Sequence, residues 1–443
     1  MTNKIERNIK NVGMIALGCE KNKIDAEIML AKLKDAGYEI CNDLEKCEVV
    51  IVHTCTFIDT AKAESIESIL DVARYKKTGN LKKLIVTGCM AERYKNDIKK
   101  EMPEVDACLG SKSFDRICTA LEELENNVPF YAHYQPLNSE TPDGHRILTS
   151  AQHSVYIKIA DGCSRHCSYC VIPSVRGEFI GRKFENIIEE AKYLANNGAK
   201  EINIIAQDST MHPELINIIK EVCNIPSVKW VRLLYCRPEG LNDELLNFMQ
   251  SEEKFVVYID LPLQHASKHI LKLMNRSGDE KTLLELLTKI RKTVTGVSLR
   301  TTFISGFPNE SEEDFEILCN FVKQAKFNNM GVFTYSRESG TKAARMRGQI
   351  DEDVKQRRSE ILMTIQFNLL AEINKNFIGN TYDVLCEGKE DDKYYGRAYF
   401  QAPDVDGKIY FTSKTPCTVG EFYKITLDSF IEYDFYGKNS MDV

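Results

Sequence analysis

Apolar runs and helical patterns alternate along the first part of the chain. Three short and almost continuously apolar runs predict buried strands. They span residues 12–17, 49–52 and 84–86. Each is followed by a segment whose apolar positions have helical spacing, at 24–33, 59–73 and 90–100. Buried strands that alternate with helices are typical of parallel sheets, so the pattern predicts a parallel sheet with helices on its faces.

The same alternation resumes after a less periodic stretch, 126–150, which contains Pro and Gly and which we interpret as a linker. Six strands are expected to begin near Val155, Glu201, Trp230, Val256, Ser298 and Met330. Helical patterns cover 184–197, 213–223, 240–250, 266–292 and 311–325. Six such units predict a partial (β/α)6 barrel, whose active site would lie at the C-terminal ends of the strands.

The pattern changes once more near the end of the chain. A charged helix at 351–377 precedes short alternating strands, which predict a small all-β barrel. Examples are 381–385, 396–400, 408–411 and 422–425. The whole chain is therefore expected to be α/β. Its first domain would span 8–125, the central domain 151–372 and the terminal β-barrel 373–440.

Composition narrows the class of protein. The chain has 443 residues, of which 43% are hydrophobic and 28% charged, as in an ordinary globular protein of two to four domains. Its net charge of −7 disfavours a protein that binds polyanions by bulk electrostatics. No apolar run is long enough for a membrane helix, and Met1–Arg7 lack the apolar part of an export signal. With 15 cysteines, the chain is expected to carry metal or redox chemistry in the cytoplasm.

One loop concentrates this chemistry. Cys163, Cys167 and Cys170 follow the first strand of the central domain with the spacing C-x3-C-x2-C. Three thiolates so spaced can hold one corner of an iron–sulfur cube and leave its fourth iron open. A structural zinc site is the alternative, but it needs a fourth ligand, and only His166 lies within the loop. The next cysteine is Cys223, and a disulfide is favoured even less.

Three more cysteines occupy equivalent positions in the first domain. Cys19, Cys55 and Cys89 each follow a predicted strand and precede a predicted helix. The C-terminal ends of parallel strands lie at one edge of a sheet, so these residues are expected to converge. A single cysteine at a strand end is usually a small buried hydrophobe, as we expect for Cys108. Three at equivalent positions predict a second 4Fe–4S site with one open iron.

The 163–170 loop, with Tyr169 before its last cysteine, resembles that of the radical S-adenosylmethionine (SAM) enzymes. The resemblance implies that the open iron chelates SAM and that one electron cleaves SAM to a 5′-deoxyadenosyl radical. Tyr169 and Gln264 are candidate SAM contacts. Gly306, beside the fifth strand end, could also border SAM, although an ordinary loop turn is equally compatible with its sequence. Arg300 could bind the SAM carboxylate or form a salt bridge inside the barrel.

Wider phrases resemble the methylthiotransferases, and within them the ribosomal-protein (RimO-type) branch. They include Leu17–Asn22, Thr54–Ile58, Gly88–Tyr94, Pro173–Gly177 and Pro262–Ser267. The resemblance implies that Cys19, Cys55 and Cys89 hold an auxiliary cluster that carries the sulfur to be inserted. It also implies that one SAM methylates this sulfur and a second generates the radical. Two loops depart from the family pattern, at Asn309 and at 209–213.

By the same resemblance, the enzyme adds a methylthio group to the β-carbon of an aspartate in the twelfth protein of the small ribosomal subunit. The terminal β-barrel resembles the TRAM domain, a substrate-binding module. From 376 to 443 it has 12 acidic and 7 basic residues, a net charge of −5. An acidic barrel suits a basic ribosomal protein better than RNA, so direct binding of tRNA is not expected. A donor such as flavodoxin or ferredoxin would supply electrons. The alternatives are methylthiolation of a tRNA adenosine and a non-catalytic electron-transfer protein.

Overall fold

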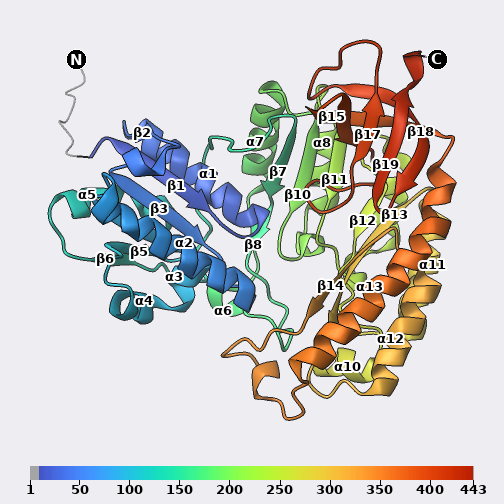
Figure 1. Cartoon of the computed structure of the whole chain (residues 1–443), viewed down its shortest axis with the longest axis horizontal. Coiled ribbons are helices and arrows are strands. Elements are labelled where there is room, and N and C mark those ends of the chain that lie inside the picture. Colours follow the sequence, from blue (N-terminus) through green and yellow to red (C-terminus); the bar gives the residue numbers. More distant parts are fainter. Residues whose placement is uncertain (1–8, 443) are drawn as a thin grey trace. The chain divides into compact units, whose positions relative to one another are not determined.

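The computed structural model describes residues 9–442 and divides into two compact units (Figure 1). The first unit contains the chain up to residue 149 together with 160–166 and 170–182. The second contains 150–159, 167–169 and the chain from 183 onward. Met1–Arg7, on which the expectation about export depends, and residue 8, the expected start of the first domain, lie outside the described residues. No helix between residues 9 and 442 has both the length and the apolarity needed to cross a membrane.

The first unit is built on a six-stranded parallel sheet, which confirms the predicted architecture. In spatial order its strands are β2 (Glu39–Ile40), β1 (Asn11–Ala16), β3 (Val49–Thr54), β4 (Lys83–Gly88), β5 (Ala107–Leu109) and β6 (Tyr131–His133). Its helices are α1 (Glu20–Asp35), α2 (Asp59–Thr78), α3 (Cys89–Arg93), α4 (Lys95–Glu101) and α5 (Ile117–Glu125). A short antiparallel pair, β8 (Ala160–Asp161) and β9 (Ile180–Gly181), flanks α6 (Ile172–Arg176).

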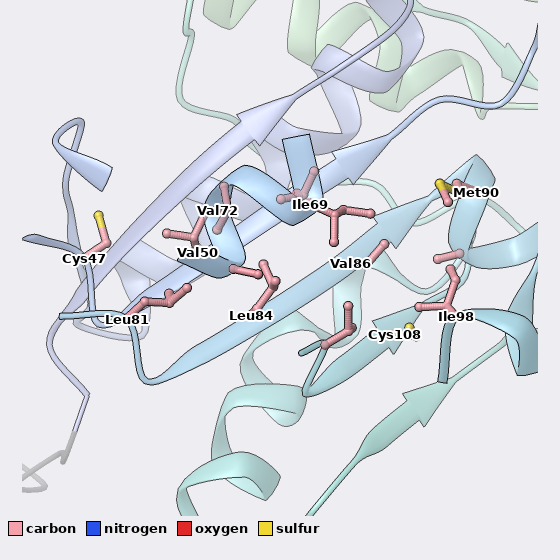
Figure 2. Packing of buried hydrophobic residues seen from close by; sticks show 14 residues of the cluster. Cys47, Val50, Ile69, Val72, Leu81, Leu84, Val86, Met90, Ile98 and Cys108 are labelled. Carbon is pink, nitrogen blue, oxygen red and sulfur yellow. The ribbon is translucent and has the colours of Figure 1, made fainter. Parts of the chain in front are cut away.

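The apolar strand residues bury one face of this sheet under helices (Figure 2). Val50, Leu84 and Val86 project from β3 and β4, and Ile69 and Val72 of α2 pack over them. All five side chains are at most 2% exposed. Burying aliphatic side chains of this size stabilises a fold by about 1.5–3 kcal/mol each. This packing holds the ends of adjacent strands at fixed positions along one sheet edge.

Two local features of the first unit differ from the sequence expectation. The helix expected over 90–100 is interrupted at Tyr94, whose backbone (φ −114°, ψ 25°) is not helical, so that α3 and α4 are separate. Strand β6 lies inside the stretch interpreted as a linker and pairs with β5. Its three residues are too few to give a periodic signal.

The second unit contains the predicted partial (β/α)6 barrel. Its parallel strands are β7 (Ser154–Lys158), β10 (Glu201–Ile205), β11 (Trp230–Leu233), β12 (Tyr258–Asp260), β13 (Ser298–Ser305) and β14 (Asn329–Thr334). A parallel bridge between Val231 and Phe255 connects the two groups of three strands. The helices are α7 (Phe184–Asn196), α8 (Leu215–Cys223), α9 (Asp243–Ser251), α10 (Lys268–Leu273), α11 (Glu280–Thr293), α12 (Glu312–Ala325) and α13 (Glu352–Asn374).

The prediction of a single helix over 266–292 is wrong. The structure has two helices there, because Asn275 (φ 58°) and Gly278 (φ 108°) adopt left-handed backbone conformations that end α10. Asp279 then begins α11: its side chain accepts from the Thr282 backbone N–H, and Thr282 reciprocates, forming a capping box.

The structure confirms the predicted small terminal β-barrel and shows that five strands close it. They are β15 (Thr381–Glu390), β16 (Lys393–Arg397), β17 (Ile409–Thr412), β19 (Asp434–Asn439) and β18 (Phe422–Ile431), in spatial order. Strand β19 was not anticipated. It pairs in parallel with β17 and antiparallel with β18, and so closes the barrel. Val384, Phe411 and Phe435 are among the residues that fill the interior.

Within the second unit, the terminal β-barrel packs against the N-terminal ends of the central strands. Arg397 Nη2 lies 2.6 Å from Oε2 of Glu201, the first residue of β10. The Tyr258 hydroxyl, at the start of β12, donates to Asp406 Oδ2 at 2.7 Å. Ser298, the first residue of β13, donates to the Phe400 carbonyl at 3.0 Å. The terminal β-barrel therefore covers the N-terminal end of the central strands, whereas Gly306 follows the C-terminal end of β13.

Candidate functional site

Cys19, Cys55 and Cys89 follow three strands that are neighbours in the sheet, β1, β3 and β4. Cys19 is the N-cap residue of α1, and Cys89 is the first residue of α3. Gly18 has φ 87°, and a Cβ atom built on it would lie 2.6 Å from Cys55 Cβ and 2.8 Å from Cys55 Sγ. The chain therefore needs glycine at this position, both for its backbone conformation and because the neighbouring strand end approaches so closely.

The three thiols also influence one another electrostatically. Burial, with Cys89 and Cys19 acting in the same direction, raises the pKa of Cys55 to about 12. Burial likewise raises the pKa of Cys89, with Cys19 again contributing. Thiols that resist ionisation together become thiolates when a cationic metal centre is bound among them. This donor set fits an iron–sulfur cluster.

Among residues 9–442, no group of three or more His, Cys, Asp or Glu side chains is arranged to hold a single metal ion. A cluster with four irons does not require that arrangement, because each thiolate ligates a different iron atom.

Asn22 fixes the start of α1 against the strand ends. Its side-chain amide donates to the Leu17 and Thr54 carbonyls, each at 3.0 Å. Its Oδ1 lies 3.8 Å from Cys89 Sγ. One buried amide thus connects the segments that carry all three cysteines.

Arg176 of α6 links this group to the beginning of the second cysteine loop. Its Nη1 lies 2.8 Å from Asp25 Oδ2 on α1 and 3.0 Å from Asp161 Oδ2, and its Nη2 donates to Asn22 Oδ1. The Arg176 side chain is 2% exposed. Burial alone would lower its pKa, but Asp161, the Cys89 sulfur and Asp25 hold it well above its ordinary value, so Arg176 remains charged. Sequence reasoning noted Arg176 only as part of a family phrase.

Each sulfur of the 163–170 loop accepts an N–H group. The Arg165 amide donates to Cys163 Sγ, and the Ile172 amide donates to Cys170 Sγ, each at 3.4 Å. Cys167 Sγ accepts from Arg237 Nη1, also at 3.4 Å. N–H groups directed at cysteine sulfurs stabilise thiolates and the clusters that they ligate. The loop therefore fits a cluster, whereas His166 is exposed.

Sequence reasoning missed Arg237. It follows β11, and its Nε lies 3.3 Å from Glu239 Oε2 and 3.9 Å from Asp208 Oδ2. Burial opposes its charge, but Cys167 and Glu239 keep its pKa above the ordinary value. The available signal was its position: a basic residue just after a barrel strand belongs to the functional edge.

Two of the predicted SAM contacts lie near C-terminal strand ends. The Tyr169 ring lies 6.4 Å from that of Phe307, almost perpendicular to it, and its hydroxyl is 3.4 Å from Arg276 Nη1. Gln264 has φ 72°, and its backbone pairs with that of Thr302 and Ile304 on β13. Both residues remain predicted contacts.

The other two are held by structural partners. A Cβ atom on Gly306 (φ 70°) would lie 2.2 Å from Lys355 Cγ, so the close approach that this glycine permits is that of α13. Arg300 lies near the N-terminal end of β13, with its Nη1 3.0 Å from Asp406 Oδ1 and its Nε 3.7 Å from Asp260 Oδ1. Of the two roles considered for Arg300, the salt bridge is the one seen.

Two further polar residues follow strands of the central domain and have polar partners. His265 is fully buried, with Nδ1 accepting from the Ser267 amide at 2.9 Å and Nε2 3.7 Å from Glu310 Oε2. Asp208, also fully buried, accepts from the Thr210 hydroxyl at 2.6 Å.

Three family models match successive parts of the chain. Residues 11–110 match the Uncharacterized protein family UPF0004, residues 157–322 the Radical SAM superfamily and residues 378–439 the TRAM domain.

Relatives match almost the whole chain. A Clostridium botulinum (strain Hall) protein named ribosomal protein uS12 methylthiotransferase RimO is 42% identical over 435 residues, covering 96% of this chain and 97% of its own. A protein of the same name from Clostridium acetobutylicum is 42% identical over 434 residues, with the same coverage. Among solved structures, the radical SAM methyltransferase TsrM from Kitasatospora setae has a TM-score of 0.55 at 12% identity. The match covers 73% of this chain and 72% of the TsrM chain. At this low identity the likeness shows a shared fold alone.

Proposed function

Because this chain belongs to the RimO family of radical SAM methylthiotransferases, we propose that it adds a methylthio group to the β-carbon of an aspartate in ribosomal protein uS12. The family uses SAM and 4Fe–4S clusters. The observation that carries the assignment of sites is that the chain places two separate sets of three cysteines after parallel strands. Neither set includes a fourth protein ligand in its motif.

We assign Cys163, Cys167 and Cys170 to the cluster that binds SAM, and Cys19, Cys55 and Cys89 to the auxiliary cluster. When bound, these groups supply an electron for SAM cleavage and a sulfur for insertion. The chain's own groups position them. Gly162 (φ 75°) supports this loop geometry, because a Cβ there would lie 2.0 Å from the Glu178 carbonyl oxygen. Arg176 and Asn22 hold the first turn of α1, which follows Cys19.

The terminal β-barrel is the proposed docking site for the ribosomal protein. The net charge of −5 over residues 376–443 attracts a basic polypeptide and repels the phosphates of RNA. Its exposed acidic residues include Asp391 and Asp392, at the turn between β15 and β16. We further propose a cytoplasmic enzyme that receives electrons from a small donor such as flavodoxin or ferredoxin and does not bind tRNA directly.

The test uses enzyme reconstituted anaerobically with iron and sulfide, then supplied with SAM and a reductant. A peptide of the ribosomal protein and tRNA are offered in separate reactions, and each is analysed by mass spectrometry. We expect a methylthio group on the peptide aspartate and none on tRNA. The matched control is the variant Cys167→Ala, which should modify neither substrate.

Modification of tRNA alone would refute the assigned substrate and the interpretation of the barrel's charge. Formation of 5′-deoxyadenosine with neither substrate modified would uphold the radical site and refute the substrate. Absence of 5′-deoxyadenosine from an enzyme with its full iron content would refute the assignment of the SAM site.

A further inference from the structure

Arg237 brings a formal positive charge to the 163–170 loop. Cys163 and Cys170 each accept from a backbone amide, whereas Cys167 accepts from the Arg237 guanidinium, at 3.4 Å. The Arg237 side chain is 11% exposed, so water screens this charge only partly.

Two carboxylates accompany the guanidinium from the same strand edge. Glu239 approaches its Nε at 3.3 Å and is itself held by the Ser277 hydroxyl at 2.5 Å. Burial would raise the pKa of Glu239, but Ser277, the backbone and Arg237 lower it to about 2, so Glu239 is ionised at neutral pH. Asp208 lies slightly farther away, at 3.9 Å, and is fully buried. Arg237 is thus fixed in one orientation, and Glu239 offsets part of its charge.

We propose that Arg237 sets the reduction potential of the cluster held by Cys163, Cys167 and Cys170, acting through its hydrogen bond to Cys167 Sγ. This role rests on the proposed function, which places a cluster in this loop. Reduction adds one electron from the small donor protein and makes the cluster more negative. A nearby positive charge and a hydrogen bond to a ligating sulfur both stabilise the reduced form.

Glu239 has the opposite effect to Arg237 on the reduction potential of the cluster. Its negative charge weakens the effect of Arg237, so removing that charge favours the reduced cluster. Arg237 and Glu239 therefore determine together how much positive charge lies beside Cys167. Arg237 is a positioning residue in this scheme: it contacts the ligand sulfur, and the reaction proceeds at other atoms.

The experiment measures the midpoint potential of this cluster by EPR-monitored redox titration. The full-length chain carries Cys19→Ala, Cys55→Ala and Cys89→Ala, so that only one cluster contributes to the spectrum. The test variants are Arg237→Gln, Arg237→Lys and Glu239→Gln. The matched control is Arg291→Gln, which removes the same charge from α11, where Arg291 donates to the Ala325 and Lys326 carbonyls.

For Arg237→Gln we expect a negative shift. At a fixed solution potential the ratio of reduced to oxidised cluster should fall about tenfold, which corresponds to about 59 mV for a one-electron couple. Arg237→Lys should stay close to the parent because it retains the charge. Glu239→Gln should shift the potential in the positive direction, and Arg291→Gln should leave it unchanged.

Equal potentials for Arg237→Gln and Arg291→Gln, or a positive shift for Arg237→Gln, would overturn the proposal. So would an Arg237→Gln chain that binds no iron while Arg237→Lys binds it fully, because Arg237 would then act in retention of the cluster. Weaker SAM binding with an unchanged potential would overturn it too, in favour of a direct contact with SAM. Each result is independent of which substrate the enzyme modifies.

Discussion

A cysteine's position relative to a strand decides its role in this chain. Cys55 and Cys89 come after the last residues of β3 and β4, where Cys19, Cys55 and Cys89 influence one another electrostatically. Cys108 lies within β5 and packs in the apolar cluster with Val86 and Ile98 (Figure 2). The same side chain is thus a candidate ligand at a strand end and an apolar filler one strand away.

Replacing Cys55 with Ala should halve the bound iron, abolish methylthio transfer and leave SAM cleavage intact, because only the auxiliary cluster loses a ligand. Iron and sulfide analysis and 5′-deoxyadenosine formation check this result. The matched control is Cys108→Ala, which should destabilise the fold by about 1 kcal/mol through a small cavity and keep its iron. Full iron content in the Cys55→Ala chain would contradict the assignment.

Arg176 should be among the most sensitive residues of the first unit. The variant Arg176→Met leaves Asp25 and Asp161 buried without their cation, and breaking a buried ion pair in this way costs about 3–5 kcal/mol. Urea denaturation measures the loss. Lys46→Ala provides the control, since its partner Asp43 and Lys46 itself are 47% and 73% exposed. That exposed pair, which water and salt screen, should contribute little to stability.

The two ends of the central strands have different partners. At the N-terminal ends, Glu201 receives Arg397 at 2.6 Å and Arg232 at 3.0 Å, all three being almost fully buried. At the C-terminal ends lie Asp208, Arg237 and the cysteine loop. The terminal β-barrel therefore contributes to the stability of the strands, whereas the candidate site lies at the opposite edge.

Glu201 should make the free energy of unfolding depend on pH within a defined range. Burial would raise its pKa, but Arg397 and Arg232 lower it from 4.5 to about 2. A depressed carboxyl pKa gives stability that is complete above pH 4.5 and lost as the pH falls toward about 2.

Glu201→Gln should therefore be less stable than the parent by a few kcal/mol above pH 4.5, and the difference should shrink toward pH 2. Denaturant unfolding at a series of pH values measures it. Glu421→Gln, at a position that is 55% exposed, serves as the control and should show a small, constant difference. A difference for Glu201→Gln that does not change with pH would contradict the expected coupling.

Elements with strong periodicity could be predicted from the sequence, and elements set by single residues could not. The strand at 49–54 begins with four apolar residues, and the strand at 201–205 has apolar residues at 202, 204 and 205; both begin at the residue expected. The break between α10 and α11 depends on the left-handed backbone at Asn275 and Gly278, which a long helical pattern concealed. Strand β6 has only three residues and is recognisable only by its pairing with β5.

At the candidate site, the strand-end cysteines could be predicted because parallel topology brings strand ends together. The roles of Arg176 and Arg237 could not, because Arg176 meets Asp25 across 151 positions of sequence and Arg237 meets Cys167 across 70. The role of Arg300 was left open for a related reason. Its partner Asp406 belongs to the terminal β-barrel, 106 positions later in the chain.

The charge of the whole molecule should affect how it meets its substrate. Both the whole chain, at −7, and residues 376–443, at −5, carry excess negative charge. Salt shortens the range of such attraction from about 10 Å at 0.1 M to about 3 Å at 1 M. Association with a basic ribosomal protein is therefore expected to slow as salt is added.

The double variant Asp391→Asn/Asp392→Asn should associate more slowly with the ribosomal protein at low salt, and the difference should vanish at high salt. Stopped-flow or surface-binding kinetics measure the rates. Lys414→Gln makes the barrel more negative and is the control of opposite sign, so it should associate slightly faster. Identical rates at all salt concentrations would show that charge does not guide this encounter.

The buried partnership between the terminal β-barrel and the central strands limits how related enzymes can be recombined. A chimera that takes this barrel from a relative would receive a surface shaped for that relative's strand ends. Glu201 and Arg300 would then need partners equivalent to Arg397 and Asp406. The segments to exchange together are accordingly the terminal β-barrel and the first residues of the central strands. A chimera joined only at the end of α13 would separate these interacting residues.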